Sequence, residues 1–359
     1  MTMSSPARTG PVRQATDPAV RGRLLARVED RLTRFVADER ARWCAVAPHA
    51  AVPIDAVAAL LQAGGKRIRP VFCLTGYLAV GGDPEDPGAV DAAAALELLQ
   101  AFALLHDDVI DDSALRRGRP TAHSAAAAEH ARAGWQGESR RYGDGVGILA
   151  GDLAYAWADR LATGLAPAAR AVWDELRTEM IIGQSIDIVV AAQRHADPEL
   201  ARWIALCKSG HYTIHRPLLL GATVAGRPDL TAVFEDYGLA VGEAFQLRDD
   251  LIDAFGDSSA SGKPAGLDFD QHKMTLLLAL VMQRDGRVHD LVSGWDRGGR
   301  WDAAALRGLL EGAGVRADVE RHIDDLVRTA RAAIADAPLP EVWRDELAHL
   351  AGRIAYRDR

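Results

Sequence analysis

Two aspartate runs in the sequence share one spacing of carboxylates. Their members are Asp107, Asp108 and Asp111 in the first run and Asp249, Asp250 and Asp253 in the second. On a helix, residues i and i+4 lie on one face, so the first and last carboxylates of each run come close together and repel. A cation offsets that repulsion, and Mg²⁺ is held by one or two carboxylates together with substrate phosphate oxygens. The spacing therefore predicts a Mg²⁺-binding site at each run.

Each aspartate run follows a segment with the composition of a buried helix. Residues 92–105 are apolar apart from Glu97 and Gln100, and residues 237–247 are mostly apolar. A helix that is apolar nearly all round is a buried one. An acidic run can also be a solvated helix face, and the pair Asp324-Asp325, which lies in a polar segment without a third aspartate, is assigned no function. The coincidence of two runs with two buried helices favours a functional site.

Basic residues supply the complementary charge. Lysine and arginine together number 42, and the lysines among them are Lys66, Lys208, Lys263 and Lys273. Lysine is a compact, mobile point charge that suits phosphate binding. Lys66 follows two glycines, and Lys263 follows a Ser- and Gly-rich stretch, residues 258–262, that could close over a substrate. Because Arg116 and Arg117 come directly after the first aspartate run, we expect cations and carboxylates to share one cavity.

The composition argues against several classes of protein. The net charge of -8 gives no support to a nucleic-acid partner. Cys44, Cys73 and Cys207 are far apart and form no CxxC pair, so we expect neither a disulfide framework nor a zinc site, and a reducing cytoplasm fits. No run of about 18 uninterrupted apolar residues is present, and no membrane span is expected.

The sequence predicts one helical domain preceded by a tail. Residues 1–20 are rich in Thr, Ser, Pro and Arg and lack the apolar centre of a signal peptide, so we expect a disordered tail. Beyond it, alanine and leucine dominate and both favour helix. Of the 359 residues 48% are hydrophobic, which is enough for a large core. We predict a single all-α domain over residues 21–359.

The sequence resembles the trans-isoprenyl diphosphate synthases, which include the geranyl, farnesyl and geranylgeranyl diphosphate synthases. The shared motifs are GGKRIRP from Gly64, ELLQAFALLHDDVIDD from Glu97, RRGRPT from Arg116, GD from Gly151, GQSID from Gly183, KSGHY from Lys208, FQLRDDLID from Phe245 and GK from Gly262. Each motif is weak alone, but together they are highly specific and span nearly the whole chain after the tail. The resemblance implies a bundle of long helices around a deep central cavity, with the two aspartate runs facing each other across it.

The resemblance also implies roles for individual residues. The expected ligands of three Mg²⁺ ions, which Mn²⁺ could replace, are Asp107, Asp111 and Asp249. The supporting carboxylates are Asp108, Asp250 and Asp253. Side chains expected on the allylic diphosphate are Arg116, Lys208 and Lys263, and those expected on isopentenyl diphosphate are Lys66, Arg69, Gln100 and Arg117. Oxygen dipoles expected around the allylic carbocation come from Ser209, Tyr212 and Gln246.

Three positions depart from the family pattern. Gln100 stands where bacterial members usually have His, but Gln also occurs in the family and can donate to phosphate. Ser209 stands where Thr is usual and keeps the hydroxyl, so little change is expected. Lys273, a further substrate-binding candidate, follows Gln271-His272 where a Gly commonly precedes the Lys. The implied reaction needs no nucleophilic side chain, because metal and cations stabilise the leaving diphosphate. The isopentenyl double bond then attacks the carbocation, and the departed diphosphate takes the proton.

The residues before the first aspartate run bear on product length. Phe102 and Ala103 stand five and four residues before Asp107, and five residues are about 7.5 Å of helix. The Phe102 ring would form a floor under the growing chain, although it could also be a plain core residue. The pattern, with no insertion in the first run, resembles geranylgeranyl diphosphate synthases. It predicts a C20 product from dimethylallyl, geranyl or farnesyl primers, with C15 as the alternative.

Two other function classes fit the sequence less well than a synthase. A class I terpene cyclase also ionises a diphosphate, but it carries an N-D-x-x-S-x-x-x-E type second site where this chain has its second aspartate run. A non-catalytic synthase subunit would be expected to have lost key Asp or Lys residues, and none is missing. The resemblance further implies a homodimer.

Overall fold

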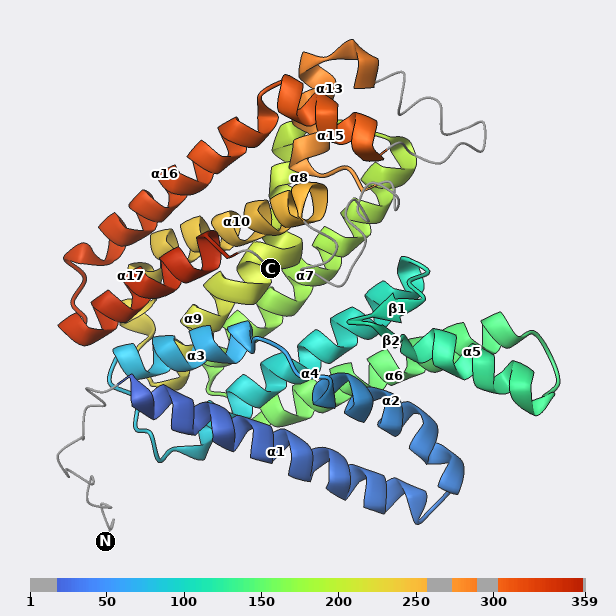
Figure 1. Cartoon of the computed structure of the whole chain (residues 1–359). Helices are drawn as coiled ribbons and strands as arrows, with labels where there is room; N and C mark the ends of the chain where they lie inside the picture. The colour runs from blue at the N-terminus through green and yellow to red at the C-terminus, as the bar shows by residue number, and fades with distance from the viewer. Residues whose placement is uncertain (1–17, 257–272, 289–302, 358–359) are drawn as a thin grey trace, which may run out of the picture.

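The computed structural model describes residues 18–256, 273–288 and 303–357, and within them the chain is a bundle of helices (Figure 1). The strands described are β1 (Leu115–Arg116) and β2 (Arg119–Pro120), which form a short antiparallel hairpin. The predicted all-α class is confirmed. Most of the predicted tail, residues 1–17, lies outside the described residues, and the first helix begins at Ala19.

The first half of the bundle packs around one central helix. Its elements are α1 (Ala19–Cys44), η1 (Pro48–Ala50), α2 (Ala51–Gln62), α3 (Ile68–Ala79), the central α4 (Pro87–Ile110), α5 (Ala122–Ala133), α6 (Ser139–Leu161) and η2 (Ala162–Gly164). Helices α1, α2, α3, α5 and α6 all contact α4. Figure 1 shows α1 along one side of the bundle and α16 along the other, with α4 and α10 between them.

The second half packs around α10. Its elements are α7 (Pro167–Gln193), α8 (Pro198–Ala205), η3 (Leu206–His215), α9 (Arg216–Val224), η4 (Pro228–Leu230), α10 (Thr231–Phe255), α13 (Leu276–Arg284), α15 (Ala303–Gly312), α16 (Val315–Ala335) and α17 (Glu341–Ala355). Helices α16 and α17 and the segment η3 pack against α10. The two halves meet where α3 and α4 contact α9.

Helix α4 has both the length and the composition of a membrane span, but its apolar residues serve the core. It begins at Pro87, where the Asp86 carboxylate accepts a hydrogen bond of 2.8 Å from the backbone of Gly88. Of its most apolar window, 67% is buried against the other helices. The residue range 92–105 predicted as a buried helix lies wholly inside it, as residues 237–247 lie inside α10.

The segment η3 is a π-helix, a form often found at functional sites. It approaches α10 closely, because a Cβ atom built on Gly210 would lie 2.9 Å from the backbone carbonyl of Gly242, and glycine stands on both sides of the contact. This approach fixes the position of Lys208, Ser209 and Tyr212, which η3 carries.

Candidate active site

The predicted site residues gather around two adjoining cavities. The first, here called the basic cavity, has a volume of about 440 Å³ and contains all four residues expected on isopentenyl diphosphate: Lys66, Arg69, Gln100 and Arg117. The second, the apolar cavity, has a volume of about 370 Å³ and contains Phe102, Ala103, Asp107, Lys208, Ser209 and Tyr212. Arg69 and Gln100 line both, so the two cavities meet at these side chains.

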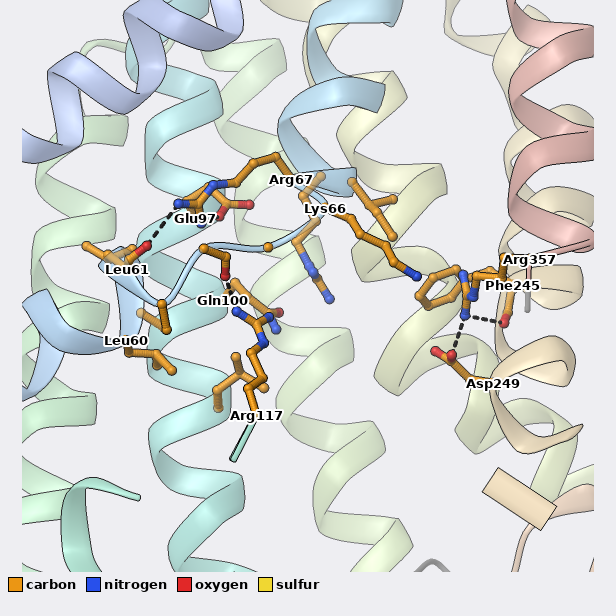
Figure 2. Close-up of a pocket in the computed structure, with 17 residues that line it drawn as sticks. Leu60, Leu61, Lys66, Arg67, Glu97, Gln100, Arg117, Phe245, Asp249 and Arg357 are labelled. Atoms are coloured by element: carbon orange, nitrogen blue, oxygen red, sulfur yellow. Dashed lines mark hydrogen bonds and ion pairs between the residues drawn. The ribbon is translucent and has the colours of Figure 1, made fainter. Parts of the chain in front are cut away.

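The basic cavity is ordered by contacts among its own residues (Figure 2). Arg117 donates to the backbone carbonyl of Gly64, in the glycine pair before Lys66. Arg69 donates to the Thr213 hydroxyl at 2.8 Å and its guanidinium lies 4.0 Å from the centre of the Tyr212 ring. Burial and the neighbouring arginines lower the pKa of Arg117, which shows how closely positive charge is packed here. Such a concentration of cations suits an anionic ligand.

A buried carboxylate holds the loop that carries Lys66. Glu97 on α4 accepts a hydrogen bond of 2.5 Å from Arg67, which also pairs with Glu29 on α1. Arg67 has a φ of 49°, in the left-handed region that a non-glycine residue rarely adopts. Burial raises the pKa of Glu97, and the positive charges of Arg67 and Arg69 oppose that rise. We interpret Glu97 and Arg67 as the anchor that orients the loop at the mouth of the basic cavity.

The first aspartate run is surrounded by cations from three separate segments. Arg116 donates to Asp108 at 2.6 Å and lies 3.5 Å from Asp107. Lys273 pairs with Asp111 at 2.9 Å, and Lys208 lies 4.0 Å from Asp107. Helix α4 ends at Ile110, so Asp111 is its C-terminal cap, yet its backbone N–H still bonds to the Asp107 carbonyl at 2.8 Å. The predicted one-face arrangement of Asp107 and Asp111 is therefore retained.

Burial controls the protonation of this run. It raises the pKa of Asp108, against the opposing charge of Arg116. It also raises the pKa of Asp111, to which the negative charge of Asp107 adds and which Lys273 opposes. Carboxylates in this state gain from any additional cation, because the cation favours the charged form.

The second aspartate run has a different environment. Asp249 is half-exposed and pairs with Arg357, which follows the end of α17. Asp250 points into the protein, where it accepts a hydrogen bond of 2.7 Å from Gln246. Asp253 is half-buried one turn further along α10. Of the three aspartates only Asp249 lines one of the two cavities, and Gln246 lines neither.

The π-helix presents its polar side chains to the apolar cavity. Lys208 donates to Asp187 on α7 at 2.7 Å, and the Tyr212 hydroxyl donates to Gln100. Gln184, also on α7, donates to Asp107 at 3.4 Å. Burial raises the pKa of Tyr212, so its hydroxyl keeps its proton. These contacts tie the π-helix to the first aspartate run.

The apolar cavity is lined by Phe102, whose ring belongs to a cluster of aromatic side chains. Its ring lies 4.7 Å from that of His106 and 4.8 Å from that of Tyr155 on α6, centre to centre. His106 has room because Gly151 faces it: a Cβ there would lie 2.1 Å from the imidazole. The Phe102 ring is thus held between two neighbours.

Several predicted residues lie outside the described residues, and several contacts were not predicted. The predicted residues that lie outside the described ones are Lys263, residues 258–262 and Gln271-His272. The contacts that were not predicted are those made by the side chains of Arg67, Asp187, Gln184 and Arg357. Signals existed for some of these: Gln184 and Asp187 belong to the quoted GQSID motif and Arg67 to GGKRIRP. Arg357 carries no local motif, and only the packing of α17 reveals it.

The carboxylates fit Mg²⁺ that arrives with substrate rather than a preformed metal cage. Across the described ranges, no three His, Cys, Asp or Glu side chains are close enough to hold an ion by themselves. Instead Asp107, Asp111 and Asp249 each face a basic side chain, which stands where a metal's charge would be. Mg²⁺ commonly binds through one or two carboxylates plus substrate phosphates, so this donor set suits it.

Comparison with known proteins agrees with this geometry. The polyprenyl synthetase family profile matches residues 53–293. The geranylgeranyl diphosphate synthase of Mycobacterium tuberculosis is 34% identical over 283 residues, covering 76% of this chain and 75% of the relative. A short chain isoprenyl diphosphate synthase of Methanothermobacter thermautotrophicus is 33% identical over 236 residues; the match covers 63% of this chain and 65% of that relative's length.

Solved structures give the same result over longer spans. The geranylgeranyl pyrophosphate synthase of Corynebacterium glutamicum, complexed with isoprenyl diphosphate and magnesium, superposes with a TM-score of 0.86 at 37% identity, covering 94% of this chain and 99% of that one. The polyprenyl synthase of Caulobacter crescentus, complexed with calcium and isoprenyl diphosphate, gives a TM-score of 0.78 at 26% identity, covering 97% and 100%. The predicted resemblance is confirmed. The chain belongs to the polyprenyl synthetase family.

Proposed function

We propose that this prenyltransferase condenses isopentenyl diphosphate head-to-tail with dimethylallyl, geranyl and farnesyl diphosphates and releases geranylgeranyl diphosphate. The observation that carries the proposal is the pair of adjoining cavities. One is basic and the other is apolar, and Asp107 of the first aspartate run lines the apolar one. Two diphosphates can bind side by side in this arrangement, with one hydrocarbon chain in the apolar cavity.

The charges divide between the two substrates. In the basic cavity, Lys66, Arg69, Gln100 and Arg117 hold the diphosphate of isopentenyl diphosphate. At the first aspartate run, Arg116 and Lys208 hold the allylic diphosphate, with Lys273 as a further candidate. Lys263, predicted for the same diphosphate, lies outside the described residues. Asp107, Asp111 and Asp249 would hold Mg²⁺, expected as three ions and replaceable by Mn²⁺; when bound, it supplies positive charge to the leaving diphosphate. Asp108, Asp250 and Asp253 support these ligands.

The surrounding side chains then guide the reaction. The C–O bond of the allylic substrate breaks as its diphosphate leaves, and the cation left behind faces the oxygen dipoles of Ser209 and Tyr212. Gln246, predicted for the same role, lines neither cavity and donates to Asp250. The isopentenyl double bond forms the new C–C bond, and the departed diphosphate accepts the proton. The link between Tyr212 and Gln100 supports this arrangement, because Gln100 borders both cavities.

We assign the control of product length to the aromatic cluster at Phe102. Phe102, which contacts His106 and Tyr155, lies roughly one and a half turns of helix before Asp107, and we assign to its ring the floor that stops the chain at C20. Ala103 lines the same cavity and leaves the adjacent position open. If the floor lies higher than this, the product is farnesyl diphosphate.

A homodimer and a cytoplasmic location complete the proposal. Large aliphatic side chains are exposed on neighbouring positions of α6 and α7: Ile148, Leu149, Ile181, Ile182, Ile188 and Val189. A second copy of the chain would cover this face, on which Ile181 and Ile188 also line the apolar cavity. Cys44, Cys73 and Cys207 are free thiols, as suits a reducing compartment. The catalytic domain spans residues 21–359.

Elongation assays with purified protein test the proposal. The protein is incubated with Mg²⁺, isopentenyl diphosphate and each allylic primer, and products are separated by chain length. We expect a C20 product from all three primers and no turnover with EDTA present. A C15 end product would overturn the length assignment, and absence of elongation with every primer would overturn the synthase function. Light scattering on the same sample, with Leu149→Glu as an interface variant, tests the dimer.

A further inference from the structure

One short hairpin carries a cation for each of the two proposed substrates. Strands β1 and β2 are joined by Arg117 and Gly118, which have φ values of 53° and 73°. Arg116 donates to Asp108, and Arg117 lies among the residues of the basic cavity (Figure 2). A two-stranded hairpin is only marginally stable by itself, and a non-glycine residue with a positive φ is strained. The positions of both arginines therefore depend on what holds the base of the hairpin.

Thr121, which follows β2, closes that base. Its backbone N–H donates to the Ala114 carbonyl at 3.1 Å, and its hydroxyl donates to the Ser113 carbonyl at 2.7 Å. Ser113 is itself held by the first aspartate run, since its N–H donates to the Asp108 carbonyl at 2.9 Å. The Thr121 side chain thus joins the end of the hairpin to the point where the hairpin leaves α4.

Helix capping does not account for this threonine. Thr121 is the N-cap residue of α5, a position where threonine commonly bonds to the N–H groups of its own helix. Its side chain makes no such bond and turns to the hairpin instead. The residue is buried, with 3% of its surface exposed. Its hydroxyl therefore serves the hairpin rather than the helix.

The imidazole of His123 is a second partner of this hydroxyl. Nδ1 lies 3.1 Å from the Thr121 oxygen, and both residues are buried. A hydroxyl has one proton, and the Ser113 carbonyl, which can only accept, takes it. Nδ1 therefore carries a proton and donates to the Thr121 oxygen. Nε2 then accepts from the Ser124 hydroxyl, which lies 3.4 Å away.

Helix α6 leaves the space that His123 occupies. A Cβ atom built on Gly143 would lie 2.3 Å from the His123 carbonyl oxygen, and one built on Gly147 would lie 3.2 Å from the His123 Cβ. The same atom on Gly147 would lie 2.6 Å from the Val109 side chain on α4. Larger residues at these two positions would push α5 away from α6, so the packing of three helices fixes the imidazole.

We infer that Thr121 and His123 are positioning residues for Arg116 and Arg117. The hydrogen bonds run from His123 Nδ1 to the Thr121 hydroxyl and on to the Ser113 carbonyl, and this chain is here called the hairpin clamp. The clamp sets the direction in which the hairpin leaves the first aspartate run. The inference rests on the proposed function, because the assignment of Arg116 to the allylic diphosphate and of Arg117 to isopentenyl diphosphate belongs to it.

Two pairs of variants test the clamp. Thr121→Val removes the hydroxyl at nearly constant volume, and Thr121→Ser keeps it. His123→Asn keeps an N–H donor near the position of Nδ1, whereas the longer side chain of His123→Gln places its donor near Nε2. His130→Gln is the matched control, since His130 is a buried histidine on the same helix that bonds to Ser139 and the Gln136 carbonyl instead. Thermal unfolding establishes that each variant is folded.

Steady-state kinetics gives a readout that a loss of stability alone would not change. Thr121→Val and His123→Gln should each raise KM for both geranyl diphosphate and isopentenyl diphosphate about tenfold, because both arginines shift together. Thr121→Ser and His123→Asn should stay within about threefold of the unmodified protein. His130→Gln should leave both KM values unchanged, although it lowers the melting temperature.

A double variant tests whether the clamp acts through the arginine. Residues that act as one unit give non-additive effects. When Arg116→Met is already present, Thr121→Val should therefore not raise KM for geranyl diphosphate further. A full tenfold additional rise would overturn the positioning role.

Hydrogen exchange tests the clamp without substrate. In Thr121→Val, the backbone amides of residues 113–121 should exchange about tenfold faster than in the unmodified protein, whereas His130→Gln should leave them unchanged. Unchanged exchange in Thr121→Val would overturn the clamp, whether or not the protein elongates a primer.

The remaining outcomes separate the inference from the function. Equal KM values in His123→Asn and His123→Gln would overturn the role given to Nδ1. If the unmodified protein elongates no primer, the proposed function fails, and hydrogen exchange still decides whether the clamp exists. If it elongates and Thr121→Val has unchanged KM values, only the inference fails.

Discussion

The two aspartate runs have the same spacing but very different surroundings. The first run, at the end of α4, is enclosed by Arg116, Lys208 and Lys273, which come from three distant segments. The second run, near the end of α10, presents Asp249 with 47% of its side chain exposed and pairs it with Arg357. One pattern of residues thus forms an enclosed site with several cations and an open site whose exposed aspartate pairs with one arginine.

The contrast suggests a division of labour. An enclosed run with several cations can receive and orient an anionic substrate before the reaction begins. The second run presents an exposed carboxylate with a single arginine beside it, so fewer fixed charges surround it. Electrostatic preorganisation for an anion is therefore greater at the first run than at the second.

The largest effect should come from removing one metal ligand of either run. Asp107→Asn and Asp249→Asn should each lower kcat/KM by about 10³-fold, because the leaving diphosphate loses a bound positive charge. Steady-state kinetics with geranyl diphosphate measures this. Asp325→Asn is the control, since Asp325 is exposed and pairs only locally with Arg328. Near-normal activity of Asp249→Asn would contradict this account, because the second run would then not hold a metal that the reaction needs.

A smaller loss should follow from removing one cation of the enclosed run. Lys208→Met should lower kcat/KM for the allylic substrate by about 10²-fold, because Lys208 links Asp187 and Asp107 beside the departing diphosphate. The measurement is kinetics with varied geranyl diphosphate at saturating isopentenyl diphosphate. Arg132→Met, an exposed arginine on α5, serves as the control. If kcat/KM for isopentenyl diphosphate falls by the same factor, the assignment of Lys208 to the allylic substrate is wrong.

Much of this comparison was predictable from local sequence. The apolar segments before each run predicted α4 and α10, and the i, i+4 spacing predicted which carboxylates share a face. The lysines and the Arg pair predicted where the cations would come from, and Lys66, Lys208 and Lys273 do lie at the two cavities or on the first run. What was predicted rests on periodicity and motif, both of which are local properties of the chain.

The unpredicted contacts are those that depend on tertiary packing. Arg357 meets Asp249 only because α17 folds back along α10, and no spacing in the sequence encodes that path. The pairing of Glu97 with Arg67 needs an arginine in a left-handed conformation, which residue preferences disfavour. The π-helix was likewise not foreseen, because its register depends on the close approach of Gly210 to α10.

Product length should change without a large loss of activity. Phe102→Ala should shift the main product beyond C20, because removing the ring opens the floor of the apolar cavity. Gly151→Ala should change product length indirectly, since its methyl group would force His106 toward Phe102. Chromatography of dephosphorylated products measures both. An unchanged product distribution in Phe102→Ala would identify Phe102 as a plain core residue.

The smallest effect on activity should come from the support beneath the π-helix. Although burial acts the other way, hydrogen bonds from Arg216 and the imidazole of His211, 3.5 Å away, lower the pKa of Glu179 to about 2. The pKa is thus below its unfolded value of 4.5, so the contribution to stability is full above pH 4.5 and is lost as pH falls through about 2. Glu179→Gln should lower the free energy of unfolding at pH 7 by about 2 kcal/mol and kcat/KM by less than about threefold.

Denaturant unfolding across pH distinguishes this account from a general loss of packing. The difference between Glu179→Gln and the unmodified protein should shrink as the pH falls from 4.5 toward 2. A constant difference over that range would mean that the ion pair is not the source of the stability.

The central claim is that both aspartate runs bind metal around one diphosphate, and anomalous diffraction tests it most directly. Crystals grown with Mn²⁺ and dimethylallyl S-thiolodiphosphate would be measured at the manganese edge. We predict anomalous peaks at Asp107, Asp111 and Asp249, bridged by the diphosphate, with Arg357 turned away from Asp249. Manganese at the first run alone, with Arg357 still paired to Asp249, would contradict the account.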